Sequence, residues 1–492
     1  MIEPIRQAKQ HQDSIAILAG SLSYRYSELI NAAENLSEIL LESKTDLAET
    51  RVALMVTPGF DYVAALWSIW QAGGIAVPLC LTHPLPSLRY TIEDSESTIL
   101  IFSPEFESIL SPLIQEKSLR ALKLGVLNTE PSSDKLPDIS LNRRALILYT
   151  SGTTNLPKGV VTTHQNIKSQ IVTLINAWKW SSNDHTLCIL PLHHVHGLIN
   201  VVSCSLWAGA TCEFLSEFDA KKVFEIFLKQ RVNVFMAVPT IYFKLITYWE
   251  SLSLAEQEKI THALSHFRFM VSGSAALPAT VMEKWKVMSH HTLLERYGMT
   301  ELGMAISNPY EGERKTGFVG LPLPGVAIRL TNETNEEVRD EPGEIQVKGE
   351  NVFLEYWNKT EATTNSFSVD GWFKTGDIAV VEHGYYRIMG RNSVDIIKSG
   401  GYKISALEIE EILRTHPHVK DCAVVGIEDE EWGEIVAAAI VSSVDQFDTD
   451  LLRAWLKEQL PPYRVPRKFH IVNELPRNAM GKVTKNDVKK WF

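Results

Sequence analysis

The segment at residues 149–159, YTSGTTNLPKG, has the residue types and spacing that most clearly indicate a chemical role. It includes the end of the apolar run ALILYT, so its Ser, Thr and Gly residues follow an expected β-strand. Backbone N–H groups and hydroxyls in such a loop can surround phosphate oxygens, and Lys158 adds a positive charge. The segment lacks the GxxxxGK[ST] pattern of a Walker A loop. Taken alone, it indicates either a phosphate-binding loop or an ordinary polar turn.

Two further segments end in acidic residues that could hold parts of a nucleotide. In 295–301, ERYGMTE, Tyr297 offers a flat ring for stacking, and Glu301 offers a carboxylate for a metal on phosphate oxygens. In 371–377, GWFKTGD, Asp377 could accept two hydrogen bonds from a ribose diol. In isolation, each segment is more typical of a surface turn.

Two segments toward the C-terminus combine cations with glycine. The segment 390–403, GRNSVDIIKSGGYK, has the features of a hinge, where a few residues must absorb a large change of φ and ψ. The segment 476–482, PRNAMGK, places Lys482 directly after a glycine. Residues 477–492 contain five Lys or Arg and one Asp, so a solvated basic tail is the alternative interpretation.

Alternating β and α patterns must position these segments. From residue 14 to about 240, short β-rich runs such as VALMV and NVFMAV alternate with helical stretches such as YVAALWSIWQAG, which predicts βαβ units around mostly parallel sheets. After about residue 310 the pattern changes to β-hairpins, and beyond Arg391 to a compact α+β segment. The expected fold class is α/β: a large N-terminal region of parallel-sheet βαβ subdomains with a small β subdomain, and a small mobile α+β C-terminal domain. We place the domains at residues 1–390 and 391–492.

The amino-acid composition argues against several classes of protein. The 492 residues include 48 Lys or Arg and 59 Asp or Glu, and the net charge of −11 argues against nucleic-acid binding through bulk charge. The five cysteines show no CxxC spacing, so neither a disulfide framework nor a zinc site is expected. The start of the chain shows no targeting signal, and the charge-free stretches 62–88 and 186–212 are interrupted by turn residues. We expect a cytoplasmic protein without an integral membrane segment, as a monomer or homodimer.

Taken together and in this order, the five motifs resemble those of the adenylate-forming superfamily of acyl-CoA synthetases, luciferases and peptide-synthetase adenylation domains. The resemblance runs from about residue 15 to the end. Within the superfamily, stretches such as PLHHVHGLIN, LLERYGMTELGMAISNP and SVDIIKSGGYKISALEIE look most like the malonyl-CoA synthetases. Two positions depart from the pattern. Asn155 stands where the family's loop usually has Gly, and the hinge segment is one residue longer than the GRxKD-type pattern, with Asp395 as the candidate pivot.

The resemblance implies two half-reactions. A carboxylic acid and ATP form an acyl-AMP and pyrophosphate, and CoA then displaces AMP to give a thioester. ATP, Mg²⁺ and CoA are therefore implied, and the small domain rotates between the two steps. The implied catalytic residues are Lys158, His194, Thr300, Glu301 and Lys482, with Glu301 also as the metal ligand. The implied nucleotide- and CoA-binding residues are Thr150, Ser151, Gly152, Thr153, Thr154, Ser274, Ala275, Ala276, Tyr297, Gly298, Met299, Asp377, Arg391, Gly400 and Gly401.

The second carboxylate of a dicarboxylic acid would need a cation, because a buried unpaired carboxylate is very costly. By resemblance, Lys244 and Arg296 are the candidate basic residues, and Ser274 could donate its hydroxyl. Arg296 is favoured because a guanidinium pairs with a carboxylate in bidentate fashion, whereas Lys244 could simply extend to water from its helix. Some bacterial malonate enzymes have a further Arg where this chain has Glu283.

Malonate is the leading acid from this resemblance, with methylmalonate as a further candidate. The alternative is a CoA or acyl-carrier-protein ligase for a fatty, aryl or other monocarboxylic acid. A third interpretation is a nucleotide-binding regulator that has lost catalysis. The joint presence of Lys158, Glu301, Asp377 and Lys482 argues against it.

Overall fold

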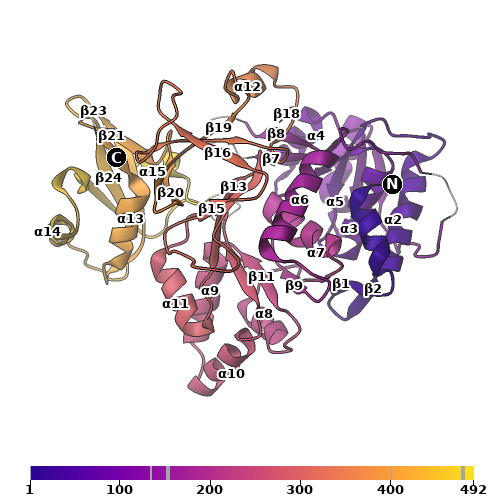
Figure 1. The fold of residues 1–492 in the computed structure, drawn as a ribbon, viewed down its shortest axis with the longest axis horizontal. Helices are drawn as coiled ribbons and strands as arrows, with labels where there is room; N and C mark the ends of the chain where they lie inside the picture. Colours follow the sequence, from indigo (N-terminus) through magenta and orange to yellow (C-terminus); the bar gives the residue numbers. More distant parts are fainter. Residues whose placement is uncertain (1, 133–135, 151–155, 401, 478–481) are drawn as a thin grey trace.

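The computed structural model describes residues 2–132, 136–150, 156–400, 402–477 and 482–492. Two large sheets with their helices form the N-terminal part, a small antiparallel sheet follows, and an α+β unit ends the chain (Figure 1). The predicted α/β class, with parallel sheets and a separate C-terminal domain, is confirmed.

A seven-stranded sheet bears the loop predicted to bind phosphate. Strands β3 to β7 pair in parallel, and β8 returns antiparallel to β7. Most of its strands are continuous apolar runs, as is typical of parallel strands covered by helices on both faces. In spatial order the strands are β18 (Glu355–Tyr356), β8 (Lys158–Thr163), β7 (Arg144–Thr150), β4 (Ile75–Pro78), β3 (Arg51–Met55), β5 (Ile99–Phe102) and β6 (Arg120–Lys123). The neighbouring helices are α2 (Tyr26–Leu41), α3 (Phe60–Gln71), α4 (Leu85–Asp94), α5 (Glu107–Lys117) and α6 (His164–Trp178).

A nine-stranded sheet positions most of the other candidate residues. Its central strands are parallel, and an antiparallel strand or pair closes each end. In spatial order the strands are β15 (Leu321–Pro322), β14 (Gly303–Ser307), β13 (Leu294–Met299), β12 (Phe269–Ser272), β11 (Val234–Ala237), β9 (His185–Cys188), β10 (Thr211–Phe214), β1 (Ile15–Ala19) and β2 (Leu22–Arg25). Aromatic side chains such as Phe227, Tyr242 and Trp285 fill the core between this sheet and the helices α8 (Ala220–Phe227), α9 (Pro239–Glu250), α10 (Leu254–Leu264) and α11 (Ala279–Ser289).

The C-terminal unit lies at one end of the molecule and packs against the small antiparallel sheet (Figure 1). The small sheet contains β16 (Ala327–Thr331), β17 (Gly343–Lys348), β19 (Phe373–Glu382) and β20 (Tyr385–Arg391). The C-terminal unit contains β21 (Ile396–Ser399), β22 (Tyr402–Ser405), α13 (Ala406–Thr415), β23 (Val419–Asp429), β24 (Gly433–Ser442), α14 (Thr449–Gln459), β25 (Lys468–Val472) and α15 (Lys485–Lys489).

Helix α13 contacts two other parts of the fold. Glu408 pairs with Arg387 of β20, and Glu411 Oε2 accepts a hydrogen bond from the backbone N–H of Ala279 at 3.1 Å. The C-terminal unit is therefore docked on both β20 and α11.

The charge-free stretches noted in the sequence are folded into the core. Residues 62–88 contain most of α3 and all of β4, and residues 186–212 contain a π-helical segment (His196–Ser203) followed by α7 (Cys204–Trp207). Among the described residues, none of the helices combines the length and the apolar character that a bilayer crossing requires.

Glu295 of β13 is an ionisable side chain that the fold buries. Burial raises the pKa of this carboxyl to about 8, although a hydrogen bond from the backbone of Leu277 acts in the opposite direction. Its Oε2 atom has no hydrogen-bond partner among the described residues. The unfolded chain would ionise this group near pH 4.5, so its burial disfavours the folded state increasingly as pH rises from about 4.5 to about 8.

We expect Glu295→Gln to stabilise the protein at alkaline pH. The amide keeps an acceptor for Leu277 and has no proton to lose, so Tm should exceed that of the native protein by a few degrees at about pH 8, and the difference should vanish at about pH 5. Thermal unfolding over this pH range measures the effect. Glu283→Gln, at an exposed position on α11, is the control and should show no such trend. A pH-independent offset for Glu295→Gln would contradict the account.

Candidate functional site

The base of the predicted phosphate loop is held by tyrosines on both sides. Thr150, at the end of β7, pairs with Lys158, at the start of β8. Next to these, the Tyr149 hydroxyl donates to Asp94 at 2.8 Å, and the Tyr90 hydroxyl donates to the carbonyl of Pro157 at 2.7 Å. The predicted ligands Ser151, Gly152, Thr153 and Thr154 lie outside the described residues.

Tyr356 links two of the predicted catalytic residues. The Lys158 ammonium lies 4.8 Å from the centre of the Tyr356 ring, and the Tyr356 hydroxyl donates to Glu301 Oε1 at 2.8 Å. Burial raises the pKa of Glu301, and the hydrogen bond from Tyr356 partly offsets that shift. The sequence analysis did not identify Tyr356, because an aromatic residue in a short strand is usually a packing residue.

Glu301 has the chemistry of a magnesium ligand. Proteins bind Mg²⁺ mostly through one or two carboxylates together with substrate phosphates. Glu301 is a buried carboxylate, and no Lys or Arg forms an ion pair with it in the described part of the chain. No group of three or more metal-binding side chains occurs among the described residues. A single carboxylate that shares a metal with ATP phosphates therefore fits this site.

Tyr297, Asp377 and Arg391 meet at one point although they come from three strands. The Tyr297 hydroxyl donates to Asp377 Oδ2 at 2.6 Å, and Arg391 Nε donates to Asp377 Oδ1 at 3.2 Å. Tyr297 belongs to β13, Asp377 to β19 and Arg391 to the end of β20. The structure thus brings Tyr297, predicted to contact adenine, together with Asp377 and Arg391, predicted to bind ribose.

The rest of the β13 turn lies next to this point. A side chain at Gly298 would place its Cβ 2.0 Å from the carbonyl oxygen of Gly303, so only glycine fits there. Met299 pairs with Gly303 across β13 and β14, and Thr300 lies between Met299 and Glu301 in the chain.

Ser274 joins a buried arginine and a buried histidine. Its hydroxyl lies 3.2 Å from His196 Nδ1 and 3.4 Å from an Arg296 guanidinium nitrogen. Ser274 itself has a left-handed φ of 71° and lies with Ala275 and Ala276 in an exposed loop after β12. Of the three histidines in the HHVHG motif, the structure thus adds His196 to the site, whereas His194 was the one predicted from the sequence.

Arg296 is a charge buried without a carboxylate partner in the described residues. The guanidinium packs on the backbone of Gly273, where an added Cβ would lie 2.4 Å from Arg296 Cζ. Burial lowers the pKa of Arg296 to about 9, which leaves it positively charged at neutral pH. Its Nε atom has no hydrogen-bond partner among the residues described. Because a buried unpaired charge is costly, this group is suited to bind an anionic ligand.

The other residues predicted to bind the acyl group and CoA do not form one cluster among the described residues. Lys244 lies exposed on α9 with its ammonium 5.6 Å from the centre of the Phe218 ring. The rings of His193 and His194 lie 4.1 Å apart, and burial lowers the pKa of His194 to about 4, so it is neutral at physiological pH. Gly400 has a left-handed φ of 55° and packs on Trp432, while Gly401 lies outside the described residues.

The candidate hinge residue Asp395 is bound to the C-terminal tail. Its carboxylate lies 2.7 Å from the ammonium of Lys485, and the charges of Lys485 and Lys482 lower its pKa. Lys482 itself is exposed. Lys485 was not selected from the sequence, because it stands in a tail whose composition is typical of a solvated segment.

Comparison with known proteins identifies the family. Residues 5–357 match the family AMP-binding enzyme, and residues 408–482 match the AMP-binding enzyme C-terminal domain. The chain is 42% identical to the Bos taurus protein named malonate–CoA ligase ACSF3, mitochondrial, with 97% of this chain and 88% of the relative covered.

Two solved structures show the same fold. The ATP-bound MatB structure from Rhodopseudomonas palustris is 32% identical, with 100% of this chain and 99% of the other covered and a TM-score of 0.91. A malonyl-CoA ligase in a ternary product complex with methylmalonyl-CoA and AMP is 34% identical, with 95% of this chain and 97% of the other covered and a TM-score of 0.70. From these matches over nearly its whole length, the chain belongs to the family of AMP-binding enzymes.

Proposed function

We propose that this protein is an ATP-dependent, AMP-forming ligase that joins malonate to CoA. The observation that carries the proposal is Arg296, a buried guanidinium next to Ser274 with no carboxylate partner in the described residues. The carboxylate of a substrate would supply the missing partner, and a dicarboxylic acid keeps its second carboxylate free for activation. The similarity to malonate–CoA ligases supports the same substrate.

Acid activation needs positive charge around the α-phosphate and the leaving pyrophosphate. We assign this role to the loop that begins at Thr150, to Lys158 and to Lys482. Glu301, with its carboxylate oriented by Tyr356, would hold Mg²⁺. The ion neutralises phosphate charge when it is bound. Ser274 to Ala276 and Tyr297 would frame the adenine, and Asp377 with Arg391 would hold the ribose.

Thioester formation needs the thiol of CoA where Lys482 acted before. We propose that the part of the chain that follows Arg391 rotates about Asp395 and brings Gly400 and Gly401 to the pantetheine arm near His194. The two TM-scores support this proposal: at similar identity and coverage, the present arrangement is closer to an ATP-bound relative than to a product-bound one. We keep the proposed boundary between the two domains at residues 390 and 391, next to the end of β20 at Arg391.

Arg296→Ala should remove malonate preference. Removing one partner of a buried charge pair typically costs about 2–5 kcal/mol, so kcat/KM for malonate should fall by about 100-fold, while residual use of acetate should change little. Pyrophosphate release with the two acids measures this ratio. Arg296→Lys should lie between the two proteins because lysine keeps the charge and loses the bidentate geometry.

The same assay tests Lys244, the other basic residue predicted to bind the second carboxylate of malonate. If Lys244 reaches the acyl group, Lys244→Ala will also lose malonate use selectively. Equal loss for both acids in Arg296→Ala would place Arg296 in the nucleotide site or the core and contradict the proposed specificity.

Tyr356→Phe should weaken binding of Mg²⁺ with ATP. Phenylalanine keeps a ring under Lys158 and loses only the hydroxyl that orients Glu301. A hydrogen bond to a charged group contributes about 1.5–3 kcal/mol, so the apparent dissociation constant for Mg²⁺ should rise by about tenfold or more. Calorimetric titration of Mg²⁺ with a non-hydrolysable ATP analogue provides this measurement without turnover. An unchanged titration would show that Tyr356 does not orient the metal ligand.

A further inference from the structure

Lys485 is a buried charge in a segment whose basic composition is typical of a solvated tail. It begins α15, and its ammonium lies 2.7 Å from a carboxylate oxygen of Asp395 and 2.7 Å from one of Glu410. Taking an ammonium group out of water is costly unless it is paired and hydrogen-bonded. The two ion pairs therefore compensate the buried charge of Lys485.

Glu410 anchors that contact to the core of the C-terminal unit. Its Oε1 atom accepts a hydrogen bond from the backbone N–H of Val424 at 2.8 Å, and its Oε2 atom lies 3.3 Å from an Arg414 guanidinium nitrogen. Glu410 and Arg414 stand on α13, and Val424 stands on β23. Lys485 is thus fixed to the framework of the C-terminal unit and moves with it.

Asp395 uses its two carboxylate oxygens toward different parts of the molecule. Oδ1 contacts Lys485, and Oδ2 accepts a hydrogen bond from the backbone N–H of Arg391 at 3.0 Å. Arg391 pairs with Asp377 across β19 and β20, so it belongs to the small antiparallel sheet. A rotation at residues 392–395 would break the bond to Arg391 and keep the contact with Lys485.

We propose that Lys485 is a positioning residue for acid activation: it docks the segment that contains Lys482 onto the hinge carboxylate Asp395. Lys485 comes three positions after Lys482, so the reach between their Cα atoms is at most about 10 Å. A fixed Lys485 therefore limits where Lys482 can lie while Asp395 also holds Arg391. The inference rests on the proposed function and on Asp395 as the pivot.

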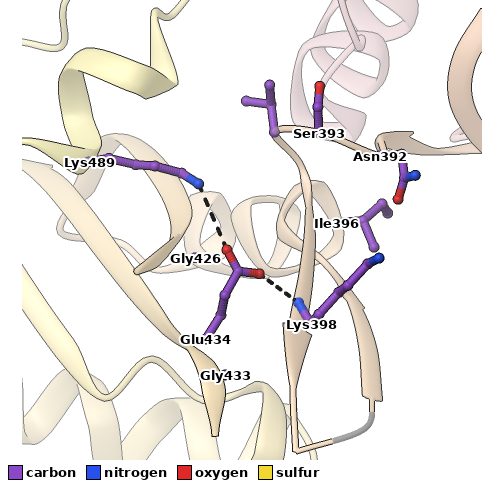
Figure 2. A pocket seen from close by; sticks show the side chains of 9 residues that line it. Asn392, Ser393, Ile396, Lys398, Gly426, Gly433, Glu434 and Lys489 are labelled. Carbon is purple, nitrogen blue, oxygen red and sulfur yellow. Dashed lines mark hydrogen bonds and ion pairs between the residues drawn. The ribbon is translucent and has the colours of Figure 1, made fainter. Parts of the chain in front are cut away.

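A neighbouring lysine on the same helix provides a matched control. Lys489, one turn further along α15, lies 3.9 Å from Glu434 Oε1, and Glu434 Oε2 accepts a hydrogen bond from the backbone N–H of Lys398 at 2.8 Å. Figure 2 shows this pair beside a pocket that the hinge residues Asn392 and Ser393 also line. Lys489 contacts neither Asp395 nor Glu410 in any of these pairs, so its loss removes a charge from α15 and leaves the hinge contact.

The experiment measures the two half-reactions separately for Lys485→Met, Lys489→Met and Lys482→Ala. Acyl-AMP formation is followed by pyrophosphate release, and CoA transfer is followed from supplied acyl-AMP. Lys485→Met should lower kcat of the first step by about tenfold or more, because a small misplacement of a catalytic group is costly. CoA transfer and KM for ATP should stay within about threefold of the native values. Lys489→Met should match the native protein, and Lys485→Arg should recover much of the lost rate.

Equal loss in both half-reactions, or no loss, would overturn the proposal. Lys485→Met leaves two carboxylates without their cation, so Asp395→Asn is measured as a second variant. It weakens the same contact and keeps an acceptor for Arg391, and it should show the same selective loss. All variants are assayed with the acid that the native protein activates fastest. If malonate is not the substrate, the native protein alone will show it. That result is distinct from a result that contradicts the positioning role of Lys485.

Discussion

The carboxylate of Asp377 is the point on which the arrangement of this molecule depends. It accepts one hydrogen bond from Tyr297 and one from Arg391, and so joins the nine-stranded sheet to the end of β20 in the small sheet, next to the proposed hinge. Glu301 and Tyr356 extend the same junction to the seven-stranded sheet, next to Lys158. The proposed nucleotide site therefore lies where elements of all three sheets come together.

Buried charges without full compensation lie at the proposed acyl site and at the proposed metal site. Arg296 is buried without a carboxylate partner in the described residues, and burial raises the pKa of Glu301 although the Tyr356 hydroxyl partly offsets that shift. Each is costly in the unliganded fold, and each gains a partner when an anion or a cation binds. Lys485 differs because both of its carboxylates belong to the protein, which is typical of a contact that fixes geometry.

Much of the fold could be predicted because its strands and helices have strong local patterns. Runs such as VALMV and NVFMAV became β3 and β11, and the helix expected at ALEIEEILRTH became α13. The pairing of Asp377 with Tyr297 and Arg391 required the ordered motifs of a family, since each motif alone is typical of a turn. Tyr356, His196 and Lys485 were missed for a physical reason. Their importance comes from burial and from partners far away in sequence, and no local spacing encodes either.

In the proposed function, the buried guanidinium of Arg296 selects a dicarboxylic acid for ATP-dependent activation. Pyrophosphate release and thioester formation, with ATP, Mg²⁺ and CoA supplied, test it when malonate, methylmalonate, acetate, octanoate and benzoate are compared in parallel. We expect kcat/KM for malonate to exceed that for acetate by about 100-fold or more, because an unfilled Arg296 site penalises an acid that lacks the second carboxylate. Preference for a monocarboxylic acid would contradict the claim and leave only the adenylate-forming chemistry.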